Sequence, residues 1–222
     1  MDVVGVDGAR GGWVAVRLTD GRFAEALFFE KFSNLAQAYS QAIVIAVDIP
    51  IGLPDRGRRK ADEQARCILG DRRSSVFFTP PRRALEAGDF DEAVEIAREL
   101  GGTISQQSYA LRPKIFEVES FALDPRIVEI HPEVSFWAMN ELHPVPYAKN
   151  TWNGLMMRLE LLRAHGLQLP HPIDGIDKVG ANDIVDAAAA AWSAWRVARG
   201  QAGSLPEHPE TGQSKRPVAI WY

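Results

Sequence analysis

Four aspartates occupy positions from which their carboxylates could act together. Asp7 ends the apolar run "DVVGVD" and Asp48 ends the run "IVIAVD", while Asp183 and Asp186 belong to "NDIVDAAAAAW". Because residues three apart lie on the same side of a helix, Asp183 and Asp186 are expected to share one face. Carboxylates crowded in this way repel one another unless a cation neutralises them. The pattern therefore favours a metal site.

Oxygen ligands of this kind suit Mg²⁺ or Mn²⁺, which keep bound water and accept phosphate oxygens of a substrate. Two such ions roughly 4 Å apart can activate a water molecule and stabilise the leaving oxygen of a displacement. In this interpretation Asp7 bridges the ions, Asp48 binds one, and Asp183 and Asp186 complete the ligand shell. The alternatives are a turn or cap role for Asp7 and a helix-terminus role for Asp183.

Two further acids and one histidine lie close together in "RIVEIHPE". Glu133 follows Pro132, so it either begins a helix or joins the aspartates, and we include it among the candidate catalytic residues. His131 is either a proton shuttle or an ordinary polar residue at a strand end, and the second interpretation is favoured. The role of Glu129 is left open.

The elements expected around these residues give a mixed α/β fold. Segments with the apolar pattern of strands are 2–7, 12–19, 22–32, 43–54 and 126–133. Helices are expected over 33–42 with Ser33 as N-cap, over 133–142, over 154–166, and from the Asp183/Asp186 pair to about Arg199. The pair Asp20-Gly21 predicts a hairpin, so the first three strands form a meander. The terminal "RPVAIWY" is apolar enough to dock onto the fold.

A helical insertion is expected over 54–125, within a single domain that spans 1–222. Pro113 should break or kink its last helical stretch. Residues 55–83 carry nine basic side chains against four acids, although the whole chain has a net charge of −4. This stretch is either a solvated helical face or a phosphate-binding surface. The candidate substrate-binding arginines are Arg58, Arg59, Arg72, Arg73, Arg82 and Arg83.

The composition, 46% hydrophobic and 24% charged, is that of an ordinary globular protein. No apolar run approaches the roughly 18 residues of a membrane helix, and the N-terminus lacks the basic region of a signal peptide. The single Cys67 excludes an internal disulfide framework and fits a reducing compartment. A cytoplasmic protein without a membrane partner is expected.

Several stretches spread over most of the chain carry a resemblance to a known family. They are "GVDGARGGWVAV", "VDIPIGLP", "RKADEQARCILGDRRSSVFFTPPRRAL", "PKIFEVE", "VEIHPEVSF" and "NDIVDAAAAAW". They are similar to domain-of-unknown-function family 429, usually described as predicted RNase H-like nucleases. The resemblance implies a ribonuclease H-like mixed sheet, a three-stranded meander plus parallel strands flanked by helices, with a helical insertion after the fourth strand.

The same resemblance implies a metal-dependent nuclease with Asp7, Asp48 and Asp183 or Asp186 as its acids. The Asp-x-x-Asp pair is similar to that of Holliday-junction resolvases, which carry Glu where this chain has Asp48. Ribonucleases H take a further Glu from the first helix, and 33–42 contains none. Nucleic acid is slightly favoured as substrate over a small phosphate ester.

Two other function classes remain open at this point. One is a non-catalytic binding module that has kept the fold. The other is a phosphotransferase of the actin-like superfold, because "VDGARGG" also resembles a strand–turn phosphate loop. The sequence shows no second loop of this kind, which such enzymes need, so this class is the less favoured of the two.

Overall fold

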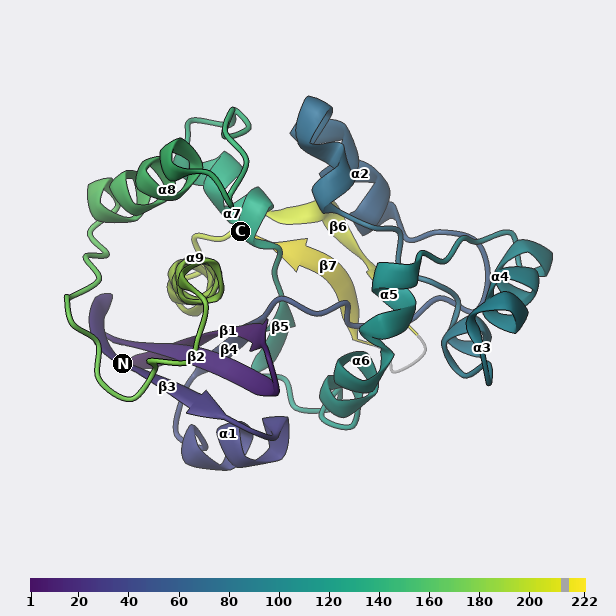
Figure 1. Cartoon of the computed structure of the whole chain (residues 1–222), viewed down its shortest axis with the longest axis horizontal. Coiled ribbons are helices and arrows are strands. Elements are labelled where there is room, and N and C mark those ends of the chain that lie inside the picture. The colour runs from purple at the N-terminus through teal and green to yellow at the C-terminus, as the bar shows by residue number, and fades with distance from the viewer. Residues whose placement is uncertain (213–215) are drawn as a thin grey trace. The chain divides into compact units, whose positions relative to one another are not determined.

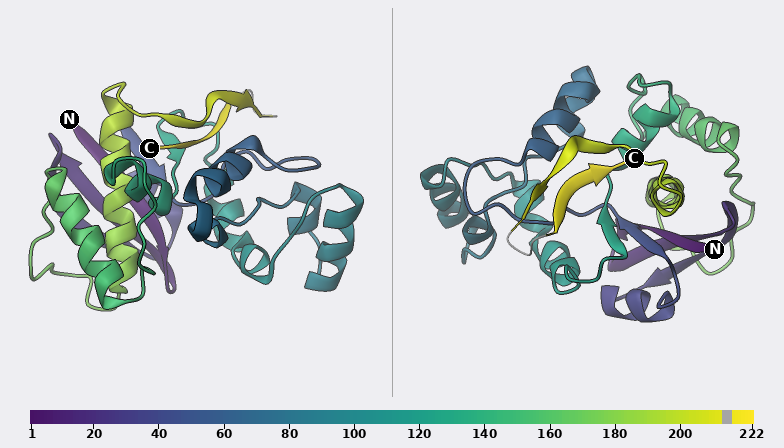
Figure 2. Two further views of the ribbon diagram at one scale, coloured as in Figure 1. Left: turned by 90° about the horizontal axis from the view of Figure 1, so that it is seen from above. Right: turned by 180° about the vertical axis from the view of Figure 1, so that it is seen from behind.

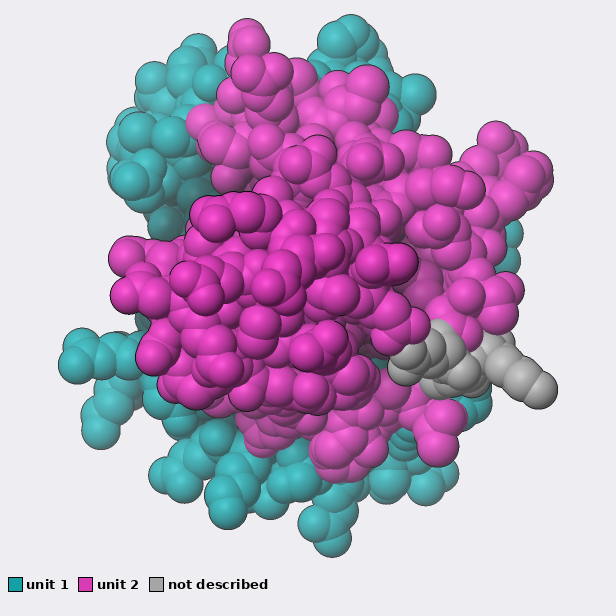
Figure 3. Space-filling model, turned by 90° about the vertical axis from the view of Figure 1, so that its right-hand side faces the viewer, with its two compact units in different colours: residues 1–49, 124–203, 221–222 teal, residues 50–123, 204–220 magenta. Residues whose placement is uncertain are grey.

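Figure 1 shows the computed structural model of the chain, which describes residues 1–212 and 216–222. The chain divides into two compact units, coloured separately in Figure 3. The first unit comprises residues 1–49, 124–203 and 221–222, and the second comprises residues 50–123 and 204–220. All candidate acids belong to the first unit, so its sheet and helices decide how they are placed.

A mixed five-stranded sheet forms the centre of the first unit. Its strands in spatial order are β3 (Arg22–Phe29), β2 (Gly12–Thr19), β1 (Asp2–Ala9), β4 (Val44–Val47) and β5 (Ile127–Glu129). The pairs β1–β2 and β2–β3 are antiparallel, whereas β4 is parallel to both β1 and β5. Val6 is in register with Val47, so Asp7 and Asp48 follow at the same end of two neighbouring strands.

The expected α/β class and the opening meander are confirmed. Asp20 and Gly21, which join β2 to β3, have φ angles of 50° and 77°. A two-residue hairpin turn with positive φ at both positions matches the right-handed twist of the flanking strands. The Asp-Gly pair therefore correctly predicted this turn.

Helices cover both faces of the sheet. Helix α1 (Phe32–Ala38) lies on one face and α9 (Ala181–Ala198) on the other, as Figures 1 and 2 show. Helices α7 (Pro132–Met139) and α8 (Trp152–Ala164) pack against α9 on the side away from the sheet. The run Ala187–Ala191 is fully buried. Its small side chains let α9 approach the sheet closely, so α9 holds Asp186 near the strand ends.

The start of the first helix differs from the expectation. Lys31 is the N-cap residue and makes no capping bond through its side chain, so the N-cap role expected for Ser33 was wrong. Phe32 is fully buried and packs edge-on against Trp13, with 5.2 Å between ring centroids. This aromatic contact holds Phe32 as the first residue of α1, so Ser33 lies inside the first turn of the helix.

The second unit contains several short helical elements and one hairpin. The helical elements are α2 (Lys60–Leu69), η1 (Gly70–Ser75), α3 (Arg82–Leu85), α4 (Phe90–Glu99), α5 (Gln106–Ala110) and α6 (Arg112–Glu119). The hairpin pairs β6 (Ser204–Thr211) with β7 (Pro217–Trp221), and all of it except Trp221 belongs to this unit. Strand β6 packs against α2. Residues 54–123 of the expected insertion fall in this unit, and α5 ends just before Pro113, as expected. The hairpin was not expected from the sequence.

Candidate acidic site

Three aspartate carboxylates come together at one end of the sheet in the first unit. Asp7 lies in β1 and is 8% exposed, Asp48 follows β4 and is half-buried, and Asp186 lies in α9 and is 2% exposed. The Asp48 amide donates to the Val6 carbonyl at 3.0 Å, which holds the two strand ends together. The Asp7 carboxylate accepts from the Gly8 amide at 2.7 Å. Two strands and one helix thus supply one carboxylate each.

The electrostatics of these residues show that they share one environment. Burial, and then the charges of Asp48 and Asp186, raise the pKa of Asp7 well above its usual value. Burial also raises the pKa of Asp48, and the charges of His131 and Lys149 oppose that rise. Burial raises the pKa of Asp186 to about 6, against the opposing effect of Lys149. Such a concentration of buried negative charge is typical of functional sites.

The two members of the Asp-x-x-Asp pair are not equivalent. Asp183 is half-buried in the first turn of α9, whose N-cap residue is Gly180. Its charge contributes to the raised pKa of Asp7, but less than the charges of Asp48 and Asp186 do. A carboxylate in the first turn is also stabilised by the positive end of the helix dipole. Asp186 is therefore the inward-facing member of the pair.

A lysine that the sequence analysis did not single out lies among these acids. The Lys149 ammonium is 2.6 Å from a carboxylate oxygen of Asp186, and its side chain is 49% exposed. Burial alone would lower the pKa of Lys149, but the contact with Asp186 and the charges of Asp7 and Asp48 raise it. Lys149 belongs to the loop between α7 and α8, where no sequence pattern marks a functional lysine.

Glu133 is held by a buried ion pair. One of its carboxylate oxygens is 2.6 Å from the Arg158 guanidinium, and the two side chains are 6% and 1% exposed. Arg158 also donates to the carbonyls of Tyr147, at 3.1 Å, and Gly154, at 3.0 Å. Arg158 thus ties the first turn of α7 to α8 and to the loop that carries Lys149. The charge of Glu133 also contributes to the raised pKa of Asp48.

His131 and Glu129 lie beside this region. His131 is the N-cap residue of α7, and its Nδ1 accepts from the Glu133 amide at 3.2 Å. Its charge lowers the pKa of Asp48, so the ring is near that carboxylate. Glu129 is 5% exposed in β5 and is in register with Val47.

The six candidate arginines differ widely in exposure within the second unit. Arg59 is 4% exposed, forms an ion pair with Asp62, and donates to the Ile51 carbonyl at 3.1 Å. Arg82 forms an ion pair with Glu119. The exposed members of the set are Arg58, Arg73 and Arg83, and Arg72 is half-buried. Arg59 therefore contributes to the interior of this unit.

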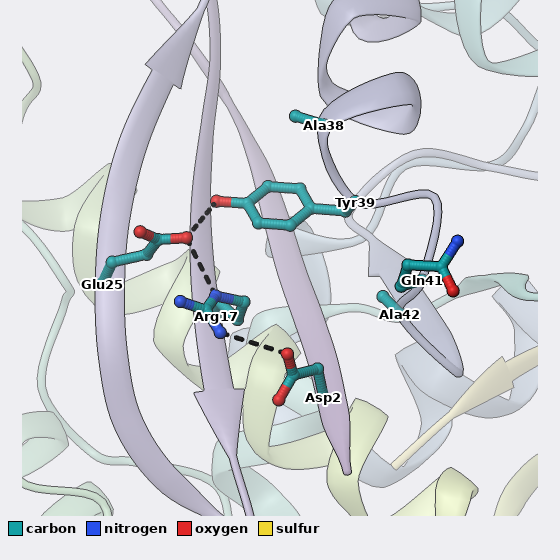
Figure 4. Close-up of a pocket in the computed structure, with 7 residues that line it drawn as sticks. All are labelled: Asp2, Arg17, Glu25, Ala38, Tyr39, Gln41 and Ala42. Carbon is teal, nitrogen blue, oxygen red and sulfur yellow. Dashed lines mark hydrogen bonds and ion pairs between the residues drawn. The ribbon is translucent and has the colours of Figure 1, made fainter.

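A second polar cluster occurs at the opposite end of β1 from Asp7. It surrounds a cavity of about 260 Å³ lined by Asp2, Arg17, Glu25, Ala38, Tyr39, Gln41 and Ala42 (Figure 4). Arg17 bonds to Glu25 at 2.8 Å and to Asp2 at 3.1 Å, and the Tyr39 hydroxyl donates to Glu25 at 3.4 Å. Because Arg17 is paired with two carboxylates, this cluster joins the strands β1, β2 and β3 to the end of α1.

Fold and site define an α/β protein with a buried acidic cluster at the ends of its central strands. The chain belongs to the family described as protein of unknown function (DUF429), whose model matches residues 5–211. No curated protein and no solved structure matches the chain. Across residues 1–212 and 216–222, none of the helices has the length and apolar character needed to cross a membrane.

Proposed function

We propose that this protein is a metal-dependent phosphodiester hydrolase, a nuclease that uses Asp7, Asp48 and Asp186 as its principal acids. The observation that carries the proposal is the meeting of these three carboxylates, which come from β1, from the end of β4 and from α9. Burial and mutual repulsion raise the pKa of Asp7, and a bound cation would relieve that repulsion. An acidic cluster that destabilises the folded protein when no ligand is bound is more typical of a binding site than of a structural feature.

The arrangement of strands supports a ribonuclease H-like fold for the first unit. The order β3-β2-β1-β4-β5 places an antiparallel meander beside two parallel strands, with α9 across one face. Nucleases of that fold carry acids on the first strand, the fourth strand and the final helix. Asp7, Asp48 and Asp186 lie in, or directly after, the corresponding elements of this chain.

The donor set fits Mg²⁺ or Mn²⁺ by its chemistry. Its atoms are carboxylate oxygens, which hard divalent cations prefer, and no thiolate or imidazole is part of the set. In the described part of the chain, no three His, Cys, Asp or Glu side chains form a ready-made metal cage. The aspartates would therefore complete the site by turning toward a shared ion. A bound ion would supply Lewis acidity and lower the pKa of a water molecule.

The neighbouring residues have supporting roles in this proposal. Asp183 adds a half-buried carboxylate at the start of α9 and could join the ligand shell. Glu133 forms an ion pair with Arg158, so it would contribute its negative charge and help to position the start of α7. His131 accepts from the Glu133 amide through its Nδ1, so its ring is held at the start of α7 beside the acids.

Nucleic acid is the proposed substrate, ahead of a small phosphate ester. The basis is the excess of five positive charges over residues 55–83, in a chain whose net charge is −4. Of the candidate arginines, Arg58, Arg73 and Arg83 expose their side chains and are the ones proposed to contact phosphates.

The test is hydrolysis of a substrate panel in the presence of Mg²⁺ or Mn²⁺. The panel contains single- and double-stranded DNA, RNA, a four-way junction and a small phosphodiester. Asp7→Asn should abolish cleavage, whereas Asp2→Asn, at the other end of β1, should retain it. If no substrate is cleaved, or if Asp7→Asn cleaves as fast as the wild type, the nuclease proposal is wrong.

A non-catalytic binding module is the second candidate, and the Lys149–Asp186 contact favours it. An ammonium at 2.6 Å from Asp186 partly neutralises the cluster without any metal. In this case the protein would bind nucleic acid, or another anionic ligand, equally well with and without divalent ions. The panel separates the two candidates, because a binding module retains substrate without cleaving it.

A further inference from the structure

The positively charged side chain of Lys149 lies among the acids of the site. Its ammonium contacts Asp186 at 2.6 Å. Its charge also opposes the rise in the pKa of Asp7 and of Asp48. The side chain of Asp186 is 3% exposed, so this contact is shielded from solvent on the side of the carboxylate. Of the neighbouring charges that shift the pKa of Asp186, that of Lys149 has the largest effect.

The loop that carries Lys149 is built to hold it in place. The Thr151 hydroxyl and amide both donate to the Ala148 carbonyl, at 2.7 Å and 3.0 Å. Gly154 packs so tightly beneath this turn that a Cβ there would be 1.9 Å from the Ala148 oxygen. Arg158 binds the Tyr147 carbonyl on the other side of the lysine. The backbone on both sides of Lys149 is thus fixed before any ligand binds.

The charges of the cluster balance with one divalent ion. Ionised Asp7, Asp48 and Asp186 carry three negative charges, and one divalent ion together with one ammonium carries three positive charges. Asp183 is half-buried and raises the pKa of Asp7 less than Asp48 and Asp186 do, so it is not part of this inner set of three. The charge of Glu133 is already matched by Arg158. Two divalent ions beside Lys149 would set five positive charges against these three negative ones, an excess of about two charges at a site where Asp7 and Asp186 are buried. The Lys149 contact also engages one of the two carboxylate oxygens of Asp186.

We propose that Lys149 occupies one of two cation positions in this site, so that the acidic cluster binds a single divalent ion. This inference rests on the proposed function, because it assumes that the aspartates bind a metal. The lysine then supplies the fixed positive charge that a second ion provides in a two-metal site. Its ammonium would hold Asp186 in place and face a phosphate oxygen of the substrate.

The experiment is equilibrium dialysis of the full chain against Mn²⁺, with free Mn²⁺ measured by electron paramagnetic resonance. The wild type should bind one Mn²⁺ per chain, and Lys149→Met should bind two, a doubling. Lys149→Arg keeps the charge and should stay at one ion. Lys178→Met is the matched control, because Lys178 is an exposed lysine of the same unit, and it should also stay at one.

The outcomes separate this inference from the proposed function. Two ions on the wild type, both lost in Asp7→Asn, would overturn the role of Lys149 and leave the metal-dependent site intact. A single ion on Lys149→Met would overturn it as well, provided that circular dichroism shows a folded variant. If none of the variants binds Mn²⁺, the proposed function fails and the inference fails with it.

Discussion

Gly5 of β1 lies directly against the backbone of Ala191 in α9. A Cβ at Gly5 would be 1.9 Å from the Ala191 nitrogen and 2.2 Å from the Ala187 oxygen. Real side chains never approach that closely, so the helix can sit on the strand only because Gly5 has no side chain. Asp7 is two residues further along the strand, and Asp186 immediately precedes Ala187. This packing contact therefore sets the separation of the two acids.

Gly5→Ala should destabilise the protein by about 3 kcal/mol or more, since the added methyl meets backbone atoms that cannot rotate away. The measurement is the free energy of unfolding in urea. Gly88→Ala is the control, because the nearest atom to its added Cβ is a flexible carboxylate oxygen of Glu92 at 3.4 Å. That variant should stay within about 0.5 kcal/mol of the wild type. Equal stability of the two variants would contradict the close packing.

The sequence indicates where the acids lie in the fold because their positions follow from simple patterns. Asp7 and Asp48 each end a short apolar run, and parallel neighbouring strands bring such ends together. The spacing of Asp183 and Asp186 indicates a shared helix face, and the alanines that follow indicate close packing. These signals are local, so they could be recognised without knowledge of the tertiary structure.

Other features depend on tertiary contacts that leave no local signal. Lys149 reaches Asp186 from a loop 37 residues away in sequence, and that reach depends on how the loop is folded. The strand β6 contains Pro206 and Pro209, which argue against a strand when the sequence is read alone. In the structure β6 has only β7 as a strand partner among the described residues, and a strand paired on one side tolerates proline.

The metal-free protein should lose stability as the pH rises through the range 4 to 6. Asp186 has a pKa of about 6 when folded and an ordinary value of 3.8, so the folded state binds its proton more tightly. Protonation thus favours the folded state, and this contribution disappears once the pH exceeds about 6. A shift of this size corresponds to on the order of 2 to 3 kcal/mol.

Urea unfolding at pH 4 to 7 in the presence of a chelator measures this effect. Asp186→Asn should flatten the dependence on pH, whereas Asp174→Asn, at an exposed position, should leave the slope unchanged. An equal dependence on pH in Asp186→Asn and the wild type would show that the pKa of Asp186 is not raised in solution.

Divalent metal should raise the melting temperature of the wild type. An ion at 100 times its dissociation constant stabilises the folded state by about 2.7 kcal/mol through mass action. Asp7→Asn should lose most of this increase, since it removes a central ligand, while Asp2→Asn should keep it. Differential scanning fluorimetry with and without Mn²⁺ gives the comparison. An equal response of Asp7→Asn and the wild type would remove Asp7 from the metal site.

Removal of Arg158 should be among the most damaging substitutions in the first unit. Arg158→Met leaves the Glu133 carboxylate buried without its ion pair, and breaking one partner of such a pair costs about 3–5 kcal/mol. The double variant Arg158→Met, Glu133→Leu should recover much of that loss, because no buried charge remains. Arg163→Met, at an exposed position of the same helix, is the control. The measurement is again the free energy of unfolding in urea.

The arginines of the second unit provide a test of the substrate class. Arg73 and Arg83 expose their side chains, whereas Arg59 is buried and paired with Asp62. If the exposed arginines bind a phosphate backbone, affinity for nucleic acid should fall steeply with salt. Each phosphate contact that is lost should reduce the slope of log affinity against log salt by about one unit. Arg73→Ala, Arg83→Ala should therefore flatten the slope by about two units without loss of stability.

Arg59→Ala should give the opposite result in the same titration. It breaks a buried ion pair, so the second unit should lose stability, while the salt slope of binding should stay as in the wild type below the melting temperature. Fluorescence anisotropy of a labelled oligonucleotide at several salt concentrations measures both variants. A shallow slope for the wild type, unchanged by Arg73→Ala, Arg83→Ala, would instead indicate a small phosphate ester, because one or two contacts suffice to hold it.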